Sequence, residues 1–269
     1  MKYDFICLGG GPVSDYLAIE LSKSDLSFLV VSDYSSSHSK NHISYDFFLE
    51  RYAHYECSQM LILSRFDLLP NSLCEGLMNV LSRSSDMKFG KLTYLSSVAV
   101  YPSASRPLSE SMPNPQSEYG RSKLQVENRL IAILGDALTV LRVSNLYGAP
   151  GVSKLESSIV QCLRNESPLR IPSSKVTRDF VHISDLLTFF LSQSSETPSG
   201  IFNFATGYAT SLISFVNQWS FSYPLKLEES LGDPFILESL ISNLKFKTET
   251  NFLFTTLDVG IPLSRKALL

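Results

Sequence analysis

Short apolar runs alternate with helix-like stretches along the first half of this chain. The apolar runs lie at residues 3–8, 28–31, 60–63, 91–96 and 138–143. Apolar residues at helical spacing cover residues 13–21, 43–57, 73–81 and 118–134. Strands separated by helices pair in parallel, and a parallel sheet needs helices on both faces. The alternation therefore predicts an α/β fold built on a doubly wound parallel sheet.

The first apolar run leads directly into a glycine-rich turn, Gly9-Gly10-Gly11-Pro12-Val13-Ser14. Strand, glycine turn and helix in this order are typical of a Rossmann-type phosphate-binding turn, because the helix N-terminus presents free N–H groups to a pyrophosphate. We expect Gly9, Gly11 and Ser14 to contact a dinucleotide cofactor. Ser14 stands where a third glycine is usual, and it is also a possible cap of the helix.

Asp33 follows the second apolar run, 24 residues after Gly9. An acid at this distance accepts hydrogen bonds from an adenosine ribose and repels a 2′-phosphate. The pattern favours NAD as cofactor and leaves NADP possible, with a strand-end turn residue as the alternative for Asp33. Ser64 follows the third apolar run and is expected near the cofactor phosphates. Its neighbour Arg65 is either a phosphate contact or a solvated charge.

Tyr119 and Lys123 are four residues apart in the predicted helix, which places both on one face. A phenol with a pKa near 10 is only about 0.1% ionised at pH 7, and a nearby ammonium lowers its pKa. We expect Lys123 to act on Tyr119 in this way and Tyr119 to exchange a proton with a hydroxyl or carbonyl. Ser97, at the end of the fourth apolar run, is expected to hold the reacting oxygen. The spacing alone is equally typical of an exposed amphipathic helix.

The chain divides near Pro150-Gly151. Residues 1–150 are predicted to form an NAD(P)-binding Rossmann domain. Residues 151–178 and 208–269 are predicted to form a smaller C-terminal substrate-binding region. The segment 179–207 is expected to return to the first domain, with a strand at 201–205.

Composition and charge exclude several classes of function. A net charge of -3 over 269 residues, with no basic stripe, offers no general attraction to nucleic acid or to an anionic membrane. The cysteines show neither a Cys-x-x-Cys pair nor a histidine at metal-ligand spacing, so we expect no metal site and a reducing compartment. No apolar run approaches 18 residues and no signal peptide is recognised. These features predict a cytoplasmic protein without a membrane span.

Several short motifs together resemble the extended short-chain dehydrogenase/reductase family, specifically its NAD-dependent sugar-nucleotide epimerase/dehydratase group. The motifs, in family order, are Gly9-x-Gly11-x-x-Ser14, Asp33, Leu95-Ser96-Ser97-Val98-Ala99-Val100-Tyr101, Tyr119-Gly120-Arg121-Ser122-Lys123, Leu141-Arg142-Val143-Ser144-Asn145-Leu146-Tyr147-Gly148, Arg178-Asp179-Phe180-Val181-His182-Ile183-Ser184-Asp185 and Phe202-Asn203-Phe204-Ala205-Thr206-Gly207. The resemblance implies a catalytic triad, which is Ser97, Tyr119 and Lys123. It also implies that Tyr119 and Lys123 lie at the nicotinamide ribose.

The same resemblance assigns substrate-binding residues and an oligomeric state. It implies that Tyr101 and Asn145, with Ser97, line the substrate side, and that Arg178 holds a phosphate of a nucleotide sugar. The planar guanidinium suits that role because it makes two parallel bonds to phosphate oxygens. A salt bridge to Asp179 or Asp185 is the alternative for Arg178. A homodimer is expected through the helix of Tyr119 and its neighbour.

The chain also departs from the family pattern. The glycine turn is compressed, and Leu63-Ser64-Arg65-Phe66 replaces the common His-x-Ala. Val98-Ala99 stands where dehydratases place Asp-Glu, and two apolar residues cannot supply a second proton-transfer pair. We therefore expect an NAD(P)-dependent oxidoreductase or epimerase that performs 4-keto reduction or C4 epimerisation of a nucleotide-activated sugar. The alternatives are a non-catalytic NAD(P)-binding regulator or scaffold and a reductase of a small non-nucleotide carbonyl compound.

Overall fold

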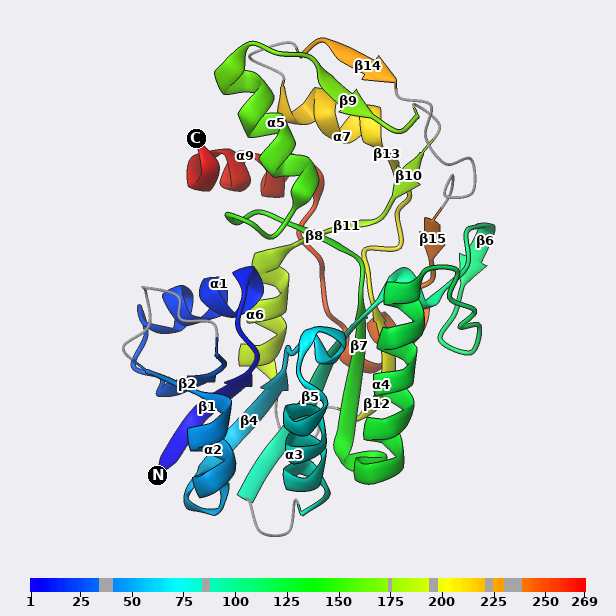
Figure 1. Ribbon diagram of the computed structural model, residues 1–269. Coiled ribbons are helices and arrows are strands. Elements are labelled where there is room, and N and C mark those ends of the chain that lie inside the picture. The colour runs from blue at the N-terminus through cyan, green and yellow to red at the C-terminus, as the bar shows by residue number, and fades with distance from the viewer. Residues whose placement is uncertain (34–40, 84–87, 174–175, 194–197, 221–224, 230–238) are drawn as a thin grey trace. The chain divides into compact units, whose positions relative to one another are not determined.

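The computed structural model divides the chain into two compact units (Figure 1). The residues that it describes are 1–33, 41–83, 88–173, 176–193, 198–220, 225–229 and 239–269. The first unit contains residues 1–100, 115–141 and 194–201. The second unit contains residues 101–114, 142–193 and 202–269. Each unit is therefore assembled from three separate segments of the chain.

A seven-stranded parallel sheet organises the first unit, in the order β12-β7-β5-β4-β1-β2-β3. Its strands are β1 (Lys2–Leu8), β2 (Phe28–Val31), β3 (His42–Ile43), β4 (Glu56–Ile62), β5 (Lys88–Ser97), β7 (Leu138–Val143) and β12 (Gly200–Phe204). The last residues of β7 and β12 belong to the second unit. Figure 1 shows the strands side by side with their carboxyl ends at one edge. The predicted doubly wound α/β fold is confirmed.

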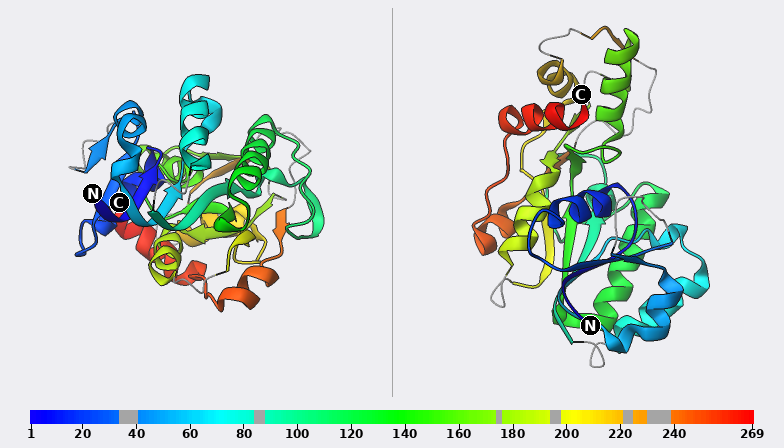
Figure 2. Two further views of the ribbon diagram at one scale, coloured as in Figure 1. Left: turned by 90° about the horizontal axis from the view of Figure 1, so that it is seen from below. Right: turned by 90° about the vertical axis from the view of Figure 1, so that its left-hand side faces the viewer.

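The helices of the first unit cover both faces of this sheet. They are α1 (Pro12–Leu21), α2 (Tyr45–Arg51), α3 (Asn71–Ser82) and α4 (Glu118–Leu134). The chain moves from β1 outward to β3, returns through α2 to β4, and then continues away to β7. Because crossovers between parallel strands are right-handed, α2, α3 and α4 lie on one face (Figure 1) and α1 lies on the other (Figure 2). The direction reverses between β1 and β4, and ligands of such sheets bind outside the carboxyl ends of the strands at this point.

The spacing of apolar residues predicted a single helix over residues 43–57. The structure does not form one continuous helix there. Ser44 caps α2 by accepting the N–H of Phe47, and α2 ends at Arg51. A 3-10 turn (Tyr52–His54) follows, and β4 begins at Glu56. The edge strand β3 has two residues, which is too short to produce a recognisable period of alternating side chains.

Among its described residues, the second unit has helices of its own and four two-stranded pairs. Its helices are α5 (Lys154–Asn165), α6 (Ile183–Ser192), α7 (Leu212–Trp219), α8 (Leu244–Thr250) and α9 (Leu257–Leu268). Its strand pairs are β8 (Asn145–Tyr147) with β11 (Phe180–His182), β10 (Thr177–Arg178) with β13 (Thr210–Ser211), β9 (Leu169–Ile171) with β14 (Leu227–Glu229), and β6 (Ala104–Leu108) with β15 (Ser239–Ile241). An apolar cluster joins α5, α7 and α9 to β8, β9 and β11, and in it the rings of Phe180 and Phe215 stack with centroids 4.1 Å apart.

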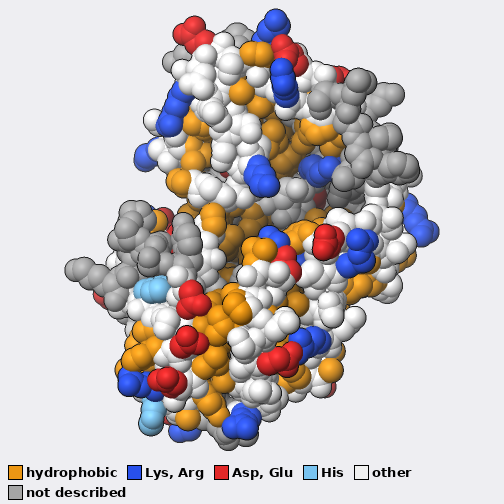
Figure 3. All heavy atoms as spheres, in the orientation of Figure 1, with side chains coloured by type: hydrophobic (Ala, Val, Ile, Leu, Met, Phe, Trp, Pro, Cys, Tyr) orange, Lys and Arg blue, Asp and Glu red, His pale blue; other side chains and the backbone are white. Residues whose placement is uncertain are grey.

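The described residues show how charge is distributed on one face and whether membrane-spanning helices or clustered metal ligands occur among them. On the face in Figure 3, acidic and basic side chains are interspersed and form no continuous basic stripe. No helix in the described part of the chain has the length and apolar character needed to cross a bilayer. Among the same residues, no three His, Cys, Asp or Glu side chains are grouped so that they could hold a metal ion.

Candidate functional site

The glycine turn after β1 has the backbone conformation that its glycines permit. Gly9 and Gly11 have φ angles of 129° and 127°, in a region that side chains disfavour. A Cβ on Gly9 would lie 2.6 Å from the backbone nitrogen of Ser64, whereas a Cβ on Gly11 would meet nothing within 4 Å. α1 begins at Pro12, and its N-cap residue Gly11 supplies no side-chain cap to the first N–H groups of the helix. The open turn and uncapped helix fit a cofactor pyrophosphate.

Two serines expected at the cofactor use their hydroxyls within the protein. Ser14 is buried and donates to the carbonyl oxygen of Gly11 at 2.8 Å. It does not cap α1, whose N-cap residue is Gly11. Ser64 is also buried, and it donates to the carbonyl oxygen of Leu8 at 2.8 Å. Both serines therefore stabilise the glycine turn and the strand ends beside it.

Asp33 lies at the carboxyl end of β2 and its side chain is exposed. Its Oδ1 accepts the backbone N–H of Tyr45, at the start of α2, at 3.2 Å. This bond orients the carboxylate at the sheet edge that also carries the glycine turn. A carboxylate so placed has further lone pairs for the hydroxyls of a ribose.

Ser97, Tyr119 and Lys123 meet at the carboxyl end of β5, within the first unit. Ser97 is the last residue of β5, and α4 carries the other two residues one turn apart. The hydroxyl of Ser97 lies near enough to the phenol of Tyr119 to lower its pKa. The Nζ of Lys123 lies 6.0 Å from the centroid of the Tyr119 ring. The structure therefore brings together the hydroxyl, the phenol and the ammonium that the sequence singled out.

Lys123 is buried, with 5% of its surface exposed. Its Nζ donates to the carbonyl oxygen of Leu95 at 2.9 Å and lies 4.9 Å from the centroid of the Tyr94 ring. Burial, and to a smaller degree the charge of Arg65, lowers the pKa of Lys123 to about 8. Lys123 is therefore mainly charged at pH 7 and loses its proton as the pH rises through about 8.

The pKa of Tyr119 differs from the expectation. We expected Lys123 to lower it, but burial of the phenol raises the pKa of Tyr119. The hydroxyl of Ser97 and the charge of Arg65 both lower this pKa and only partly offset the effect of burial. The ring thus has a closer cation than Lys123, since the guanidinium carbon of Arg65 lies 4.6 Å from its centroid.

Arg65 is a residue whose role the sequence left open. It follows β4, and its Nε donates to Oδ1 of Asp67 at 2.8 Å, while Nη2 donates to Oδ2. This two-point ion pair raises the pKa of Arg65 and lowers the pKa of Asp67. Its position in the segment that departs from the family pattern was the available sequence signal.

Gly120 is a second residue whose role sequence reasoning missed. A Cβ on Gly120 would lie 2.0 Å from the carbonyl oxygen of Ala99 and 3.0 Å from the Cβ of Pro115. The N–H of Gly120 donates to the hydroxyl of Ser117, the N-cap residue of α4, at 3.0 Å. Because Gly120 directly follows Tyr119, this close approach of α4 determines how near the Tyr119 ring lies to the end of β5. A glycine inside a helix costs about 1 kcal/mol relative to alanine, and that cost was the signal in the sequence.

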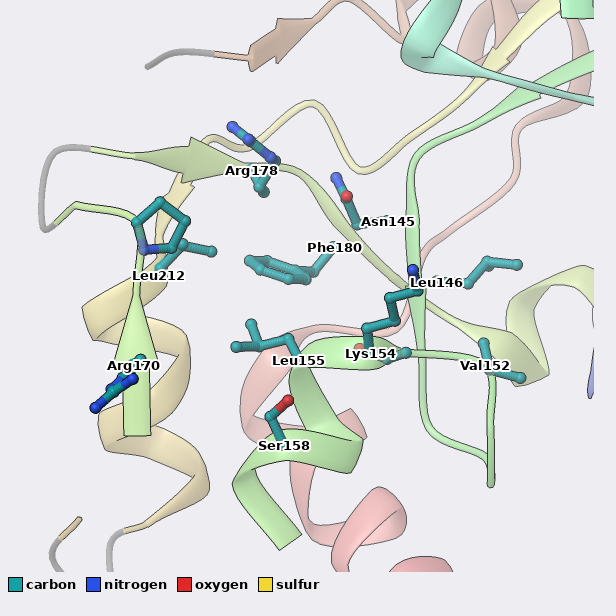
Figure 4. Close-up of a pocket in the computed structure, with 12 residues that line it drawn as sticks. Asn145, Leu146, Val152, Lys154, Leu155, Ser158, Arg170, Arg178, Phe180 and Leu212 are labelled. Carbon is teal, nitrogen blue, oxygen red and sulfur yellow. The ribbon is translucent and has the colours of Figure 1, made fainter. Parts of the chain in front are cut away.

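The second unit contains a cavity of about 450 Å³ (Figure 4). It is lined by Asn145, Leu146, Val152, Ser153, Lys154, Leu155, Ser158, Arg170, Pro172, Arg178, Phe180 and Leu212. Figure 4 shows Arg178, Asn145 and Phe180 on one side of the cavity and residues of α5, including Lys154 and Leu155, on the other. Three cationic side chains and an aromatic ring thus surround one space, an arrangement suited to an anionic ligand with an apolar part.

Asp179 and Asp185, the two acids considered as salt-bridge partners of Arg178, make other contacts. The buried carboxylate of Asp179 accepts N–H groups of Thr206, Gly207 and Tyr208. Asp185 accepts the backbone N–H and the hydroxyl of Thr255. Burial lowers the pKa of Arg178. A desolvated guanidinium at a cavity wall is suited to a phosphate.

Asn145 and Tyr101 both lie in the second unit but have different surroundings. Asn145 lines the cavity, and its Nδ2 donates to the carbonyl oxygen of Asp179 at 2.9 Å. Tyr101 is buried, is not among the cavity-lining residues, and its hydroxyl donates to Oδ1 of Asn203 at 2.6 Å. The same hydroxyl accepts a hydrogen bond from Nη1 of Arg142 at 2.8 Å. The hydroxyl of Tyr101 is thus engaged within a buried polar network.

A doubly wound sheet with a glycine turn after its first strand, and with a Ser, Tyr and Lys cluster at the end of β5, defines the extended short-chain dehydrogenase/reductase class. The chain belongs to the NAD dependent epimerase/dehydratase family, whose profile matches residues 70–205, just over half of the chain. The membership that the motifs predicted is confirmed.

One curated relative resembles this chain in sequence, and several solved structures resemble it in fold. A candidate UDP-glucose 4-epimerase of Methanocaldococcus jannaschii is 32% identical over 151 residues, which are 51% of this chain and 48% of that relative. The match therefore spans about half the length of that relative. The Bordetella bronchiseptica enzyme WbmG, solved with NAD and UDP, superposes with a TM-score of 0.81 at 17% identity over 99% of this chain and 94% of that chain. UDP-glucose 4-epimerase of Thermotoga maritima, solved with UDP-glucose, gives a TM-score of 0.78 at 17% identity and covers 100% of both chains.

Proposed function

We propose that this protein is an NAD(P)-dependent oxidoreductase or epimerase that acts on a nucleotide-activated sugar by 4-keto reduction or C4 epimerisation. The observation that carries the proposal is the interaction of the Ser97 hydroxyl with the Tyr119 phenol beside the buried Lys123. Family membership supports the reaction class. The named relatives support a nucleotide sugar as substrate, since one is a candidate UDP-glucose 4-epimerase and another was solved with UDP-glucose.

The residues at the carboxyl edge of the sheet are suited to NAD. Gly9, Gly11 and the first turn of α1 would hold its pyrophosphate, and Asp33 would bind the adenosine ribose. Tyr119 and Lys123 would lie at the nicotinamide ribose. NAD, when bound, accepts and returns the hydride. The exposed carboxylate of Asp33 repels a 2′-phosphate, and this favours NAD over NADP.

Tyr119 would exchange the proton of the substrate oxygen. With its pKa raised by burial, the phenol is protonated at neutral pH, so it is ready to donate a proton to a carbonyl oxygen. Ser97 would hold that oxygen through its hydroxyl, and Lys123 is fixed by its bond to Leu95. Val98, directly after Ser97, offers no group for the second proton transfer that removal of water requires.

The cavity of the second unit supports the proposed substrate class. Its volume is about 450 Å³, within the roughly 300–1,000 Å³ of ordinary ligand pockets. Arg178 and Lys154 would neutralise a diphosphate, and Phe180 offers an apolar wall for a base or a sugar. A small carbonyl compound without phosphate would offer no anion to Arg178 and Lys154.

The first test compares Tyr119→Phe with Tyr208→Phe, a control at a tyrosine that is 72% exposed. Purified proteins are assayed with a panel of nucleotide sugars and their 4-keto forms, by nicotinamide absorbance and product NMR. Tyr119→Phe should lose about 10²–10⁴-fold in turnover and keep its affinity for NAD, whereas the control should match the wild type. Unchanged turnover in Tyr119→Phe would remove Tyr119 from the mechanism. Tight NAD binding without turnover of any substrate would favour the regulator or scaffold.

The second test asks whether the substrate carries a nucleoside diphosphate. Arg178→Met should weaken binding of a nucleoside diphosphate by at least tenfold, measured by calorimetry, while NAD affinity is unchanged. An unchanged affinity would favour the small-carbonyl alternative. We also expect a homodimer that pairs through α4 and α3, and light scattering that shows only monomers would contradict it. A cytoplasmic location stays a prediction.

A further inference from the structure

We propose that Arg65 is a positioning residue of the Tyr119 site: its guanidinium, held by Asp67, packs over the phenol ring, fixes the orientation of the ring and stabilises its ionised form. The catalytic consequence rests on the proposed function. The effect on the side chain of Tyr119 does not, so the two are tested separately.

The guanidinium of Arg65 lies over the Tyr119 ring, and Asp67 restricts the movement of the guanidinium. The guanidinium carbon of Arg65 lies 4.6 Å from the centroid of the Tyr119 ring, within the roughly 6 Å at which a cation interacts with an aromatic face. Two hydrogen bonds to the carboxylate of Asp67 hold the guanidinium plane. A bidentate pair of this kind restricts rotation that a single bond allows. The ring is therefore packed against a group whose own orientation is fixed.

The local backbone keeps this group beside the site. Arg65 precedes the 3-10 turn Phe66–Leu68, which also carries Asp67. The preceding residue, Ser64, is anchored in the sheet through its bond to Leu8. The side chains of Arg65 and Asp67 thus extend from a short, fixed connection at the carboxyl end of β4.

Charged and titratable groups reach Tyr119 from three elements. Arg65 and Asp67 come from the connection after β4, Lys123 comes from α4, and Tyr94 comes from β5. Arg65 lowers the pKa of Tyr119 more than Asp67 raises it. The pKa of Lys123 is about 8, so its charge disappears in the range where a phenol ionises. Arg65 stays charged throughout that range and is the cation that persists.

The test uses two neutral variants, a conservative variant and a matched control. Arg65→Gln removes the charge, Arg65→Met also keeps the apolar stem over the ring, and Arg65→Lys keeps the charge without the planar fork. The side chain of Arg65 is 45% exposed, so these changes leave the core intact. Arg129→Gln is the control, because Arg129 lies on the same helix as Tyr119 and pairs with Glu75 at 2.9 Å.

The direct readout is the titration of Tyr119 by NMR. Full-length protein labelled at the tyrosine Cζ with carbon-13 is titrated without cofactor or substrate, and the Tyr119 signal is assigned with Tyr119→Phe. In Arg65→Gln and Arg65→Met the midpoint should move to higher pH, so that the phenolate fraction at a given pH falls about tenfold. Arg65→Lys should recover part of the change, and Arg129→Gln should leave the midpoint unchanged. Midpoints equal to the wild type in both neutral variants would overturn the proposal.

Turnover provides the second readout, with the nucleotide sugar on which the wild type is active. The limb of the pH profile of kcat/KM that follows Tyr119 should shift in Arg65→Gln in the same direction as the NMR midpoint. A loss of turnover with no shift of that limb and no shift of the midpoint would overturn the positioning role. If the wild type turns over no substrate, the proposed function fails, while the NMR titration still decides the role of Arg65.

Discussion

Gly120→Ala tests how closely α4 must approach the end of β5. The added Cβ would lie 2.0 Å from the carbonyl oxygen of Ala99, and real Cβ atoms do not approach within 3.0 Å. The obstacle is a backbone atom, so α4 has to move by about 1 Å at its first turn. Tyr119 directly precedes the substituted residue and moves with it, which moves its phenol away from Ser97.

The expected effect is a large loss of turnover with a small loss of stability. Overpacking costs about 1–3 kcal/mol, whereas replacing a helical glycine by alanine returns about 1 kcal/mol. The net destabilisation is then roughly 1 kcal/mol, or a few degrees in Tm. A displacement near 1 Å at a reacting group costs about 10²-fold in rate. Turnover of a nucleotide sugar and thermal unfolding are measured side by side.

Gly76→Ala is the matched control. Gly76 lies in α3, and the nearest atom to its added Cβ is Cδ1 of Leu49 at 2.8 Å, the end of a flexible side chain. Leu49 rotates away, so this variant should keep its turnover and its stability. Equal Tm and equal kcat/KM in the two alanine variants would refute the idea that Gly120 sets the position of Tyr119.

Three further predictions concern buried ionisable groups. Burial lowers the pKa of Lys123 from 10.5 to about 8, so wild type should gain up to about 3 kcal/mol of stability over Lys123→Met as the pH rises from 8 to 10.5, measured by urea unfolding. Burial lowers the pKa of His182 from 6.5 to about 4, so wild type should lose up to about 3 kcal/mol between pH 6.5 and 4, and His182→Phe should lack this acid limb. Both carboxylate oxygens of Asp179 accept backbone N–H groups, so in Asp179→Asn the new NH2 group faces a donor instead of accepting from it. This variant should lose about 3 kcal/mol or more of stability in thermal unfolding.

The central strands were predictable because burial on both faces leaves a continuous apolar run. Met60, Leu61 and Ile62 in β4 are all buried, and this pattern requires no knowledge of the neighbouring strands. The two- and three-residue strands of the second unit are shorter than any period, so only their partners define them. β10, for example, exists because Arg178 pairs with Thr210.

The candidate site divides in the same way. Tyr119 and Lys123 share a helix face, so their spacing alone predicts that they are close. Arg65 reaches the Tyr119 ring across 54 positions of the chain, and no local pattern encodes that contact. The pKa of Tyr119 was predicted with the wrong direction because burial, the largest contribution, is a property of packing.

The interleaving of the two units along the chain has a consequence during synthesis. The first unit is complete only after residue 201, so the ribosome makes about half of the second unit before β12 can join the sheet. Until then β7 has an unpaired edge, and an open edge is a place where another nascent chain can attach. A helper protein that shields such edges should therefore raise the yield of correctly folded protein most when it acts on the nascent chain before β12 emerges.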